Sequence, residues 1–317
     1  MQRSLKKPKP FWLRSGVLKP LASRLNATAA AIRLSTCCAH LHAALVVASL
    51  MPVTAVASCP SPGQWWQAQQ PLTNAELLAS ASQQQVVLLG EQHDQLAHHR
   101  WQLHTLAGLH ALRDDMVIGL EMLPRSAQPA LDAWVADELD KATLLEQTQW
   151  DDAWGFDSAL YMPILEFARM AKIPLVALNI TPDLRQRLVN DGWESVPAAE
   201  RHAIPQPREA SPAYQTRLTD VFNQHDMGDN PEMLERFIQA QLTWDVAMAQ
   251  RLSEAAEDGA LAVGLMGLGH VTYNEGVAHQ LAALGINATL SLLPWQMSHC
   301  ELPETALADA VYILADD

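Results

Sequence analysis

The feature that most constrains the fold is a series of short, continuously apolar runs that alternate with longer segments of helical periodicity. Four such runs occupy residues 86–89, 116–120, 174–178 and 261–266. Apolar runs of this length are typical of strands that are buried on both faces. Because helical segments separate them, we expect an α/β fold in which a mostly parallel sheet carries helices on both faces.

The remaining segments complete this expected domain. Residues 289–293 and 310–314 are predicted to be strands, the second at an edge of the sheet, and residues 59–71 form a lead rich in proline, glycine and glutamine. Thr73 followed by Glu76 has the pattern of a capping box and predicts a helix over residues 73–80. Further helices are expected at residues 98–112, 127–139, 141–147, 158–171, 232–256 and 277–284. Residues 182–235 are polar, proline-rich and weakly periodic, so we interpret them as a smaller helical insertion or lid within a single domain of residues 59–317.

Charge is distributed unevenly along the chain. Residues 1–58 hold four lysines and four arginines and no acidic residue. Subtracting these eight from the 21 basic residues leaves 13 against 35 acidic ones from Cys59 onward, a net charge of −22. A body this acidic repels phosphate backbones, so nucleic acid is not an expected partner.

The basic head has the features of a targeting segment. An apolar stretch over residues 43–57 ends in Ala55-Val56-Ala57, a small-x-small cleavage pattern. This stretch is shorter than the roughly 20 residues that a membrane-spanning helix needs. We therefore expect residues 1–58 to be a signal peptide region and the protein to be exported, with a buried helix of the folded domain as the alternative.

Two cysteines, Cys59 and Cys300, would remain after cleavage. Residues 56–59 resemble a lipoprotein cleavage box, in which Cys59 would carry a lipid anchor to the outer membrane. Alternatively, Cys59 and Cys300 form a disulfide, which suits an oxidising periplasm. The two alternatives exclude each other, and both place the protein outside the cytoplasm.

Polar residues follow the predicted interior strands where each strand ends. Glu91 and His93 follow the first strand, Glu121 the second, Asn179 the third, and His270 the fourth. Ligands of parallel α/β sheets bind beyond the carboxyl ends of the strands, where the loops converge. We therefore expect these side chains to form one site, the alternative being a structural hydrogen-bond network.

Other segments add candidates to this site. Gln241 and Asp245 are four residues apart and so lie on one face of a long helix. Tyr161 precedes another helix, and its phenol is either a core group with a bonded hydroxyl or a ligand. Nucleotide-binding glycine loops, Cys-x-x-Cys, His-Glu-x-x-His and Gly-x-Ser-x-Gly motifs are absent from the sequence.

These motifs together resemble the ChaN-like family of haem-binding, iron-regulated lipoproteins. The resemblance rests, in order, on residues 88–93 (LLGEQH), 119–122 (GLEM), Trp154 with 161–168 (YMPILEFA), 178–180 (LNI), the pairs 240–241 (AQ), 244–245 (WD) and 248–249 (MA), 267–271 (GLGHV) and 276–277 (GV). It covers about residues 86–284, and the match is poor over residues 182–235. The broader group includes Tiki-type metalloproteases and erythromycin-esterase-like proteins.

The resemblance implies a parallel sheet with a small helical subdomain, and haem held by a tyrosine ligand in a pocket shared between two protomers. Tyr161 matches the family tyrosine and is the expected ligand of the haem iron, with Tyr214 as the alternative. The cofactor-binding residues would be Glu91, His93, Glu121, Tyr161, Asn179, Gln241, Asp245 and His270. A homodimer is the expected protein assembly.

The sequence is compatible with three functions. The first is an exported haem-binding protein of iron acquisition or handling, without catalytic residues. The second is a metal-dependent hydrolase, in which Glu91 or Glu121 is the general base and His93 and His270 bind a divalent metal or activate water. The third is an exported scaffold whose polar network is structural.

Overall fold

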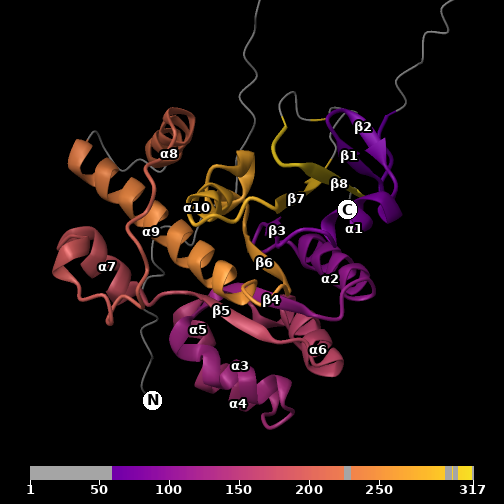
Figure 1. Ribbon diagram of the computed structural model, residues 1–317, viewed down its shortest axis with the longest axis horizontal. Helices are drawn as coiled ribbons and strands as arrows, with labels where there is room; N and C mark the ends of the chain where they lie inside the picture. The colour runs from indigo at the N-terminus through magenta and orange to yellow at the C-terminus, as the bar shows by residue number, and fades with distance from the viewer. Residues whose placement is uncertain (1–58, 225–229, 297–301, 303–305, 316–317) are drawn as a thin grey trace, which may run out of the picture.

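The computed structural model describes residues 59–224, 230–296, 302 and 306–315. An eight-stranded sheet forms its centre, with strand order β2-β1-β8-β7-β3-β6-β4-β5 (Figure 1). The strands are β1 Trp65–Gln67, β2 Gln70–Leu72, β3 Val86–Glu91, β4 Met116–Pro124, β5 Leu175–Asn179, β6 Leu261–Gly267, β7 Thr289–Gln296 and β8 Ala310–Leu314. The pairs β1–β2 and β1–β8 are antiparallel, and the other pairs are parallel. The predicted α/β class with a mostly parallel sheet is confirmed.

Helices cover both faces of the sheet (Figure 1). They are α1 Asn74–Ala81, α2 Leu96–His110, α3 Gln128–Val135, α4 Lys141–Gln147, α5 Trp150–Ala153, α6 Met162–Ala171, α7 Pro182–Asn190, α8 Pro212–Gln224, α9 Pro231–Ala255 and α10 Val277–Ala283. Short 3-10 helices occupy η2 Arg125–Ala127, η3 Ser158–Leu160, η4 Trp193–Ser195, η5 Leu268–His270 and η6 Thr272–Asn274. The predicted capping box of α1 is present, because Thr73 Oγ1 accepts a hydrogen bond from the Glu76 amide and Glu76 accepts one from the Thr73 amide.

The apolar strands divide their side chains between two cores. Val87 and Leu89 of β3 pack into a core with α1, α2, α3 and α6, whereas Val86 and Leu88 pack into a second core beneath α9 and α10. Because both faces of β3 are buried, every residue of the strand must be apolar until the strand reaches Glu91. This accounts for the continuous hydrophobic runs in the sequence.

One expectation about the end of the domain is wrong, because of a hairpin at its start. Residues 65–72 form the hairpin of β1 and β2, which the sequence did not predict. This hairpin pairs with β8, so β8 lies between β7 and β1 and is not an edge strand. The edge strands of the sheet are β2 and β5.

Residues 182–235 contain α7, η4, α8 and the beginning of α9. Their buried side chains form two small clusters apart from the main cores, one around Leu184, Leu188 and Ile204 and one around Tyr214 and Leu218. No helix in the part of the chain that the structure describes is long and apolar enough to cross a membrane.

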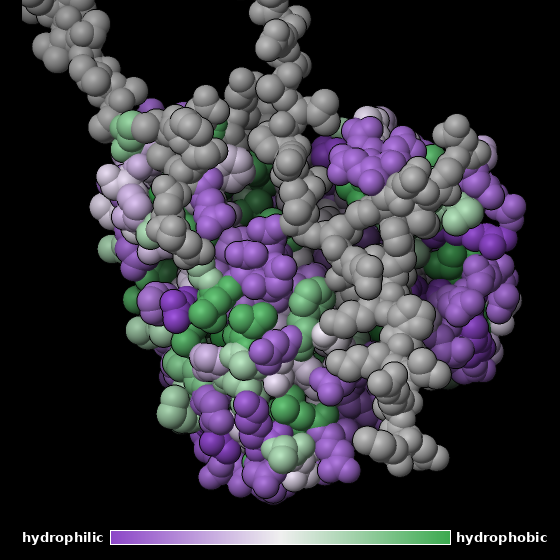
Figure 2. Space-filling model, turned by 180° about the vertical axis from the view of Figure 1, so that it is seen from behind, coloured by the Kyte–Doolittle hydropathy of each residue, from purple (hydrophilic) through white to green (hydrophobic). Residues whose placement is uncertain are grey.

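The surface behind the view of Figure 1 is mixed in character. Where described residues are visible, hydrophobic residues appear in small groups between hydrophilic ones (Figure 2). Cys59 is disulfide-bonded, and Cys300, the partner that the sequence suggests, lies outside the described residues. The predicted signal peptide region, residues 1–58, lies outside them as well.

Candidate functional site

The candidate site lies where β3, β4, β5 and β6 end. The strand β6 lies between β3 and β4, and its register places Gly267 opposite Glu91. Glu121 projects from β4 on the other side of β6, and its Oε2 accepts a hydrogen bond of 2.6 Å from the Gly267 amide. Asn179, at the end of β5, donates a hydrogen bond from Nδ2 to the carbonyl oxygen of Glu121. The strand-end residues therefore come together as the sequence predicts.

One half of the site is built around Glu91. This carboxylate is 1% exposed, and its Oε1 lies 2.6 Å from His93 Nδ1. The same oxygen accepts a hydrogen bond of 3.1 Å from the Tyr161 hydroxyl. Within the described chain, the second oxygen, Oε2, has no hydrogen-bond partner. His99 packs against the Tyr161 ring at 4.3 Å between centroids.

The other half of the site is a buried chain of polar groups from Tyr214 to Glu121. The Tyr214 hydroxyl donates to Asp245 Oδ2 at 2.8 Å, and Asp245 Oδ1 lies 2.6 Å from His270 Nδ1. The other imidazole nitrogen of His270, Nε2, lies 3.4 Å from Glu121 Oε1. The side-chain amide of Gln241 lies 3.0 Å from His270 Nδ1.

These contacts determine the charges in the network. Burial by itself disfavours the imidazolium of His270, but Glu121 and Asp245 outweigh burial and raise its pKa to about 10. Burial opposes the ionisation of Glu121 too, yet His270, His93 and the Gly267 amide lower its pKa below the ordinary value. For His93, burial is again outweighed, here by Glu91, and its pKa is raised. The network therefore holds the His270 imidazolium against the Glu121 carboxylate at neutral pH.

Gly267 allows the two halves to approach each other. A Cβ atom on this residue would lie 2.8 Å from Cε1 and 3.1 Å from Nε2 of His93. Carbon atoms do not approach this closely without repulsion, so a side chain here would displace the imidazole. The glycine at the end of β6 is needed for the space beside it, since its φ of −63° is available to any residue.

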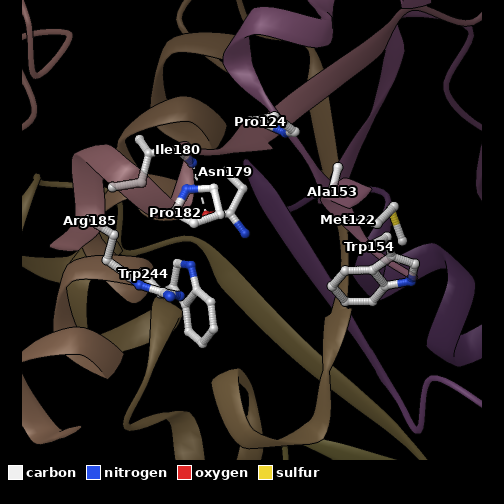
Figure 3. Close-up of a pocket in the computed structure, with 9 residues that line it drawn as sticks. All are labelled: Met122, Pro124, Ala153, Trp154, Asn179, Ile180, Pro182, Arg185 and Trp244. Atoms are coloured by element: carbon white, nitrogen blue, oxygen red, sulfur yellow. Dashed lines mark hydrogen bonds between the residues drawn. The ribbon is translucent and has the colours of Figure 1, made fainter. Parts of the chain in front are cut away.

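A cleft opens next to the network, between two indole rings (Figure 3). Trp154, Met122 and Ala153 form one wall, and Trp244, Arg185 and Ile180 face them; Pro124, Asn179 and Pro182 complete the lining. The Trp154 ring meets His93 edge-on at 4.5 Å, and the Trp244 ring lies 5.8 Å from His270. Each wall of the cleft therefore packs on one histidine of the network.

The cleft is small. Its volume is about 40 Å³, well below the roughly 300 Å³ at the lower end of ordinary small-molecule sites. A planar ligand of the size of a porphyrin cannot enter it whole. The cleft can hold only a small group that projects from such a ligand.

The two predicted iron ligands lie inside the network. Tyr161 and Tyr214 are 2% and 3% exposed, and their hydroxyls donate to Glu91 and Asp245. Burial first, and these carboxylates second, raise the pKa of both phenols well above the ordinary value of 10.0. Each hydroxyl is thus engaged with a carboxylate, and either tyrosine would have to give up that hydrogen bond to bind iron.

The metal site of the hydrolase hypothesis is not supported. Among the residues that the structure describes, no group of three His, Cys, Asp or Glu side chains is arranged to hold a metal ion. Both ring nitrogens of His270 face carboxylates, and Nδ1 of His93 is bonded to Glu91.

The structure thus brings together all eight residues predicted to bind the cofactor, and it joins Tyr214 to them. Sequence reasoning missed Arg185 and Trp154 as lining residues of the cleft. The sequence does carry a signal for the start of the helix that holds Arg185, because Thr181 followed by Pro182 is a helix-start pattern directly after the strand that ends at Asn179. The Thr181 side chain does cap α7, by accepting a hydrogen bond from the Leu184 amide.

Comparisons with known proteins identify a family that this chain matches. A family model described as "Haem-binding uptake, Tiki superfamily, ChaN" matches residues 77–281. No curated protein sequence matches the chain at a significant level.

Among solved structures, the fold is similar to that of "Cofacial heme binding to ChaN of Campylobacter jejuni", with a TM-score of 0.64, 18% identity, and coverage of 78% of this chain and 95% of that chain. The type III effector HopBA1 is more distant, with a TM-score of 0.43, 16% identity, and coverage of 76% and 92%. A mutant of the erythromycin esterase EreC in its open conformation has a TM-score of 0.39 at 12% identity, with coverage of 73% and 77%.

Proposed function

Because this chain belongs to the ChaN family of haem-binding uptake proteins in the Tiki superfamily, we propose that it binds haem beside the Glu–His network. The observation that carries the proposal is the cleft between Trp154 and Trp244, which contains the Arg185 side chain. Indole rings provide apolar surface for a porphyrin edge, and a guanidinium provides charge for a propionate. These groups offset locally the net charge of −22, which gives no general attraction for an anionic ligand.

We further propose that the porphyrin lies across the mouth of the cleft and is covered by a second copy of the chain. The volume of about 40 Å³ admits a propionate but leaves the macrocycle outside. A porphyrin bound this way keeps one face in water unless another surface covers it. Cofacial haem binding is stated for the Campylobacter jejuni relative, and the same arrangement here would pair two haems in a homodimer.

We propose that a tyrosine is the axial ligand of the haem iron. Tyr161 or Tyr214 would have to leave a carboxylate partner and become exposed before either could bind iron. Tyr273 needs no such change, because its side chain is half-buried and it lies three residues after His270. Its backbone has a φ of 63°, an uncommon conformation for a non-glycine residue, and Arg217 stacks on its ring at 4.1 Å. We add Tyr273 as the candidate that is already accessible.

Export and a role in iron acquisition belong to the same proposal. The basic head, the apolar stretch and the small-x-small pattern support cleavage near residue 58. The disulfide at Cys59 fits an oxidising compartment and favours that alternative over acylation of the same sulfur. We propose the periplasm as the place where the protein handles haem.

Titration of the purified protein with hemin tests the proposal. We expect a saturable Soret shift, and sedimentation that changes from monomer to dimer as hemin is added. Separate replacement of Tyr161, Tyr214 and Tyr273 by phenylalanine identifies the iron ligand, since only the ligand variant should lose the tyrosinate charge-transfer spectrum. A wild-type protein without a saturable shift would rule out the haem proposal.

A further inference from the structure

The cleft contains one buried cationic side chain, that of Arg185. This residue lies in the first turns of α7, shortly after β5 ends at Asn179, and it is 7% exposed. Its guanidinium carbon lies 3.9 Å from the centre of the Trp244 ring. Stacking on an indole fixes the plane of a guanidinium, and a stacked guanidinium forms its hydrogen bonds through the N–H groups at its edge, in that plane.

The other lining residues give the cleft little further polar character. Seven of the nine are Met122, Pro124, Ala153, Trp154, Ile180, Pro182 and Trp244. The eighth, Asn179, uses both ends of its amide, since Nδ2 donates to the Glu121 carbonyl and Oδ1 accepts from the Ile180 amide. Arg185 is the charged residue among the nine that line the cleft, and its positive charge suits an anionic ligand.

The size of the cleft limits what this ligand can be. A volume of about 40 Å³ admits a small group and not a whole drug-sized ligand. A carboxylate is such a small group and matches a guanidinium with two parallel hydrogen bonds. Larger anions would have to remain outside.

The surrounding charges favour an anion at this place. Burial lowers the pKa of Arg185 to about 10, which still leaves the guanidinium charged at neutral pH. The N-terminus of α7 adds partial positive charge, since its first residue, Pro182, borders the cleft. Glu91 and Glu121 lie nearby, but each is paired with an imidazole.

We infer that the cleft between Trp154 and Trp244 is a carboxylate-binding subsite in which Arg185 binds the anion. This inference rests on the proposed function where the carboxylate is a haem propionate. The same chemistry would hold a free small carboxylate if the protein does not bind haem.

The test compares three ligands on the full-length protein: hemin, hemin dimethyl ester, in which both propionates are masked, and sodium propionate. In Arg185→Gln we expect hemin affinity to fall about tenfold to a hundredfold, as for a lost charge-assisted hydrogen bond. Affinity for the dimethyl ester should stay within about twofold of the wild type. Arg185→Lys, which keeps a positive charge, should recover part of the loss.

Arg187→Gln is the matched control. Arg187 lies on the same helix, and its pairing with Glu200 on the surface leaves it away from the cleft. This variant should bind all three ligands as the wild type does. Thermal unfolding of each variant shows whether the helix is intact.

The outcomes separate the inference from the proposed function. Unchanged hemin binding in Arg185→Gln, or equal losses for hemin and its ester, would overturn the inference while haem binding stands. A wild type that binds propionate through Arg185 but does not bind hemin would support the subsite and reject the haem proposal. If neither ligand binds, both are rejected.

Discussion

The ion pair between Glu121 and His270 permits a quantitative prediction. Both side chains are buried, and His270 Nε2 lies 3.4 Å from Glu121 Oε1. At an effective dielectric constant of about 20, two unit charges at this separation attract each other by about 5 kcal/mol. Breaking a buried pair from one side typically costs roughly 3–5 kcal/mol, because the remaining charge is left without its partner. We therefore expect Glu121→Gln to lower the free energy of unfolding by several kcal/mol, a large part of the roughly 5–15 kcal/mol of an ordinary domain.

The loss of unfolding free energy in Glu121→Gln should depend on pH. The pKa of His270 is raised from 6.5 to about 10, so its contribution is complete below pH 6.5 and is lost as the pH rises through 10. The pKa of Glu121 is lowered from 4.5, so its contribution is complete above pH 4.5 and is lost as the pH falls through the lowered value. The difference between wild type and Glu121→Gln should therefore be largest between about pH 4.5 and 6.5.

Urea unfolding followed by tryptophan fluorescence measures these differences at pH 6 and pH 10. A double-mutant cycle with Glu121→Gln and His270→Gln isolates the interaction of the pair from other effects of each change. Glu166→Gln, which breaks an exposed pair with Arg169, is the control and should cost at most about 1 kcal/mol. A coupling energy below about 1 kcal/mol at pH 6, or equal values at both pH values, would refute the assignment of charge in the network.

Three further substitutions test other parts of the structure. Tyr161→Phe removes a donor to Glu91, so the free energy of unfolding of the hemin-free protein, measured with urea, should fall by about 1–3 kcal/mol. Gly267→Ala places a methyl group against His93 and should lower the free energy of unfolding by roughly 1–3 kcal/mol. The displaced imidazole should also change its pKa, which NMR titration measures. An unchanged pKa of His93 would contradict the close approach. Thr73→Ala removes the N-cap of α1, and urea unfolding should show a loss of about 0.5–2 kcal/mol without any change in hemin binding.

Much of the fold could be predicted because its strands are short and buried on both faces. The run that forms β3 has no polar residue before Glu91, and such a continuous apolar run predicts a strand that is buried on both faces. The hairpin of β1 and β2 could not be predicted in this way. Its turn residues, Ala68 and Gln69, have φ values of 47° and 66° without the asparagine or glycine that normally marks such a turn.

The candidate site, too, could be predicted only in part. Strand ends could be located, and Glu91 and His93 could be placed together, because residues two apart in extended chain share a face. The partners of His270 depend on how α9 packs across the sheet, and periodicity does not specify that packing. Arg185 was missed because its segment is polar and weakly periodic, so its burial against Trp244 is visible only in three dimensions.

The position of β6 in the sheet affects how the protein can be made. This strand lies between β3 and β4, although the hydrogen bond from Gly267 to Glu121 spans 146 positions of the chain. A nascent chain without β6 would therefore have two apolar strands whose facing edges have no partner. Such edges aggregate readily, and contacts this distant in sequence form slowly. The central pairing of the sheet therefore cannot be completed before residues 261–267 have been synthesised.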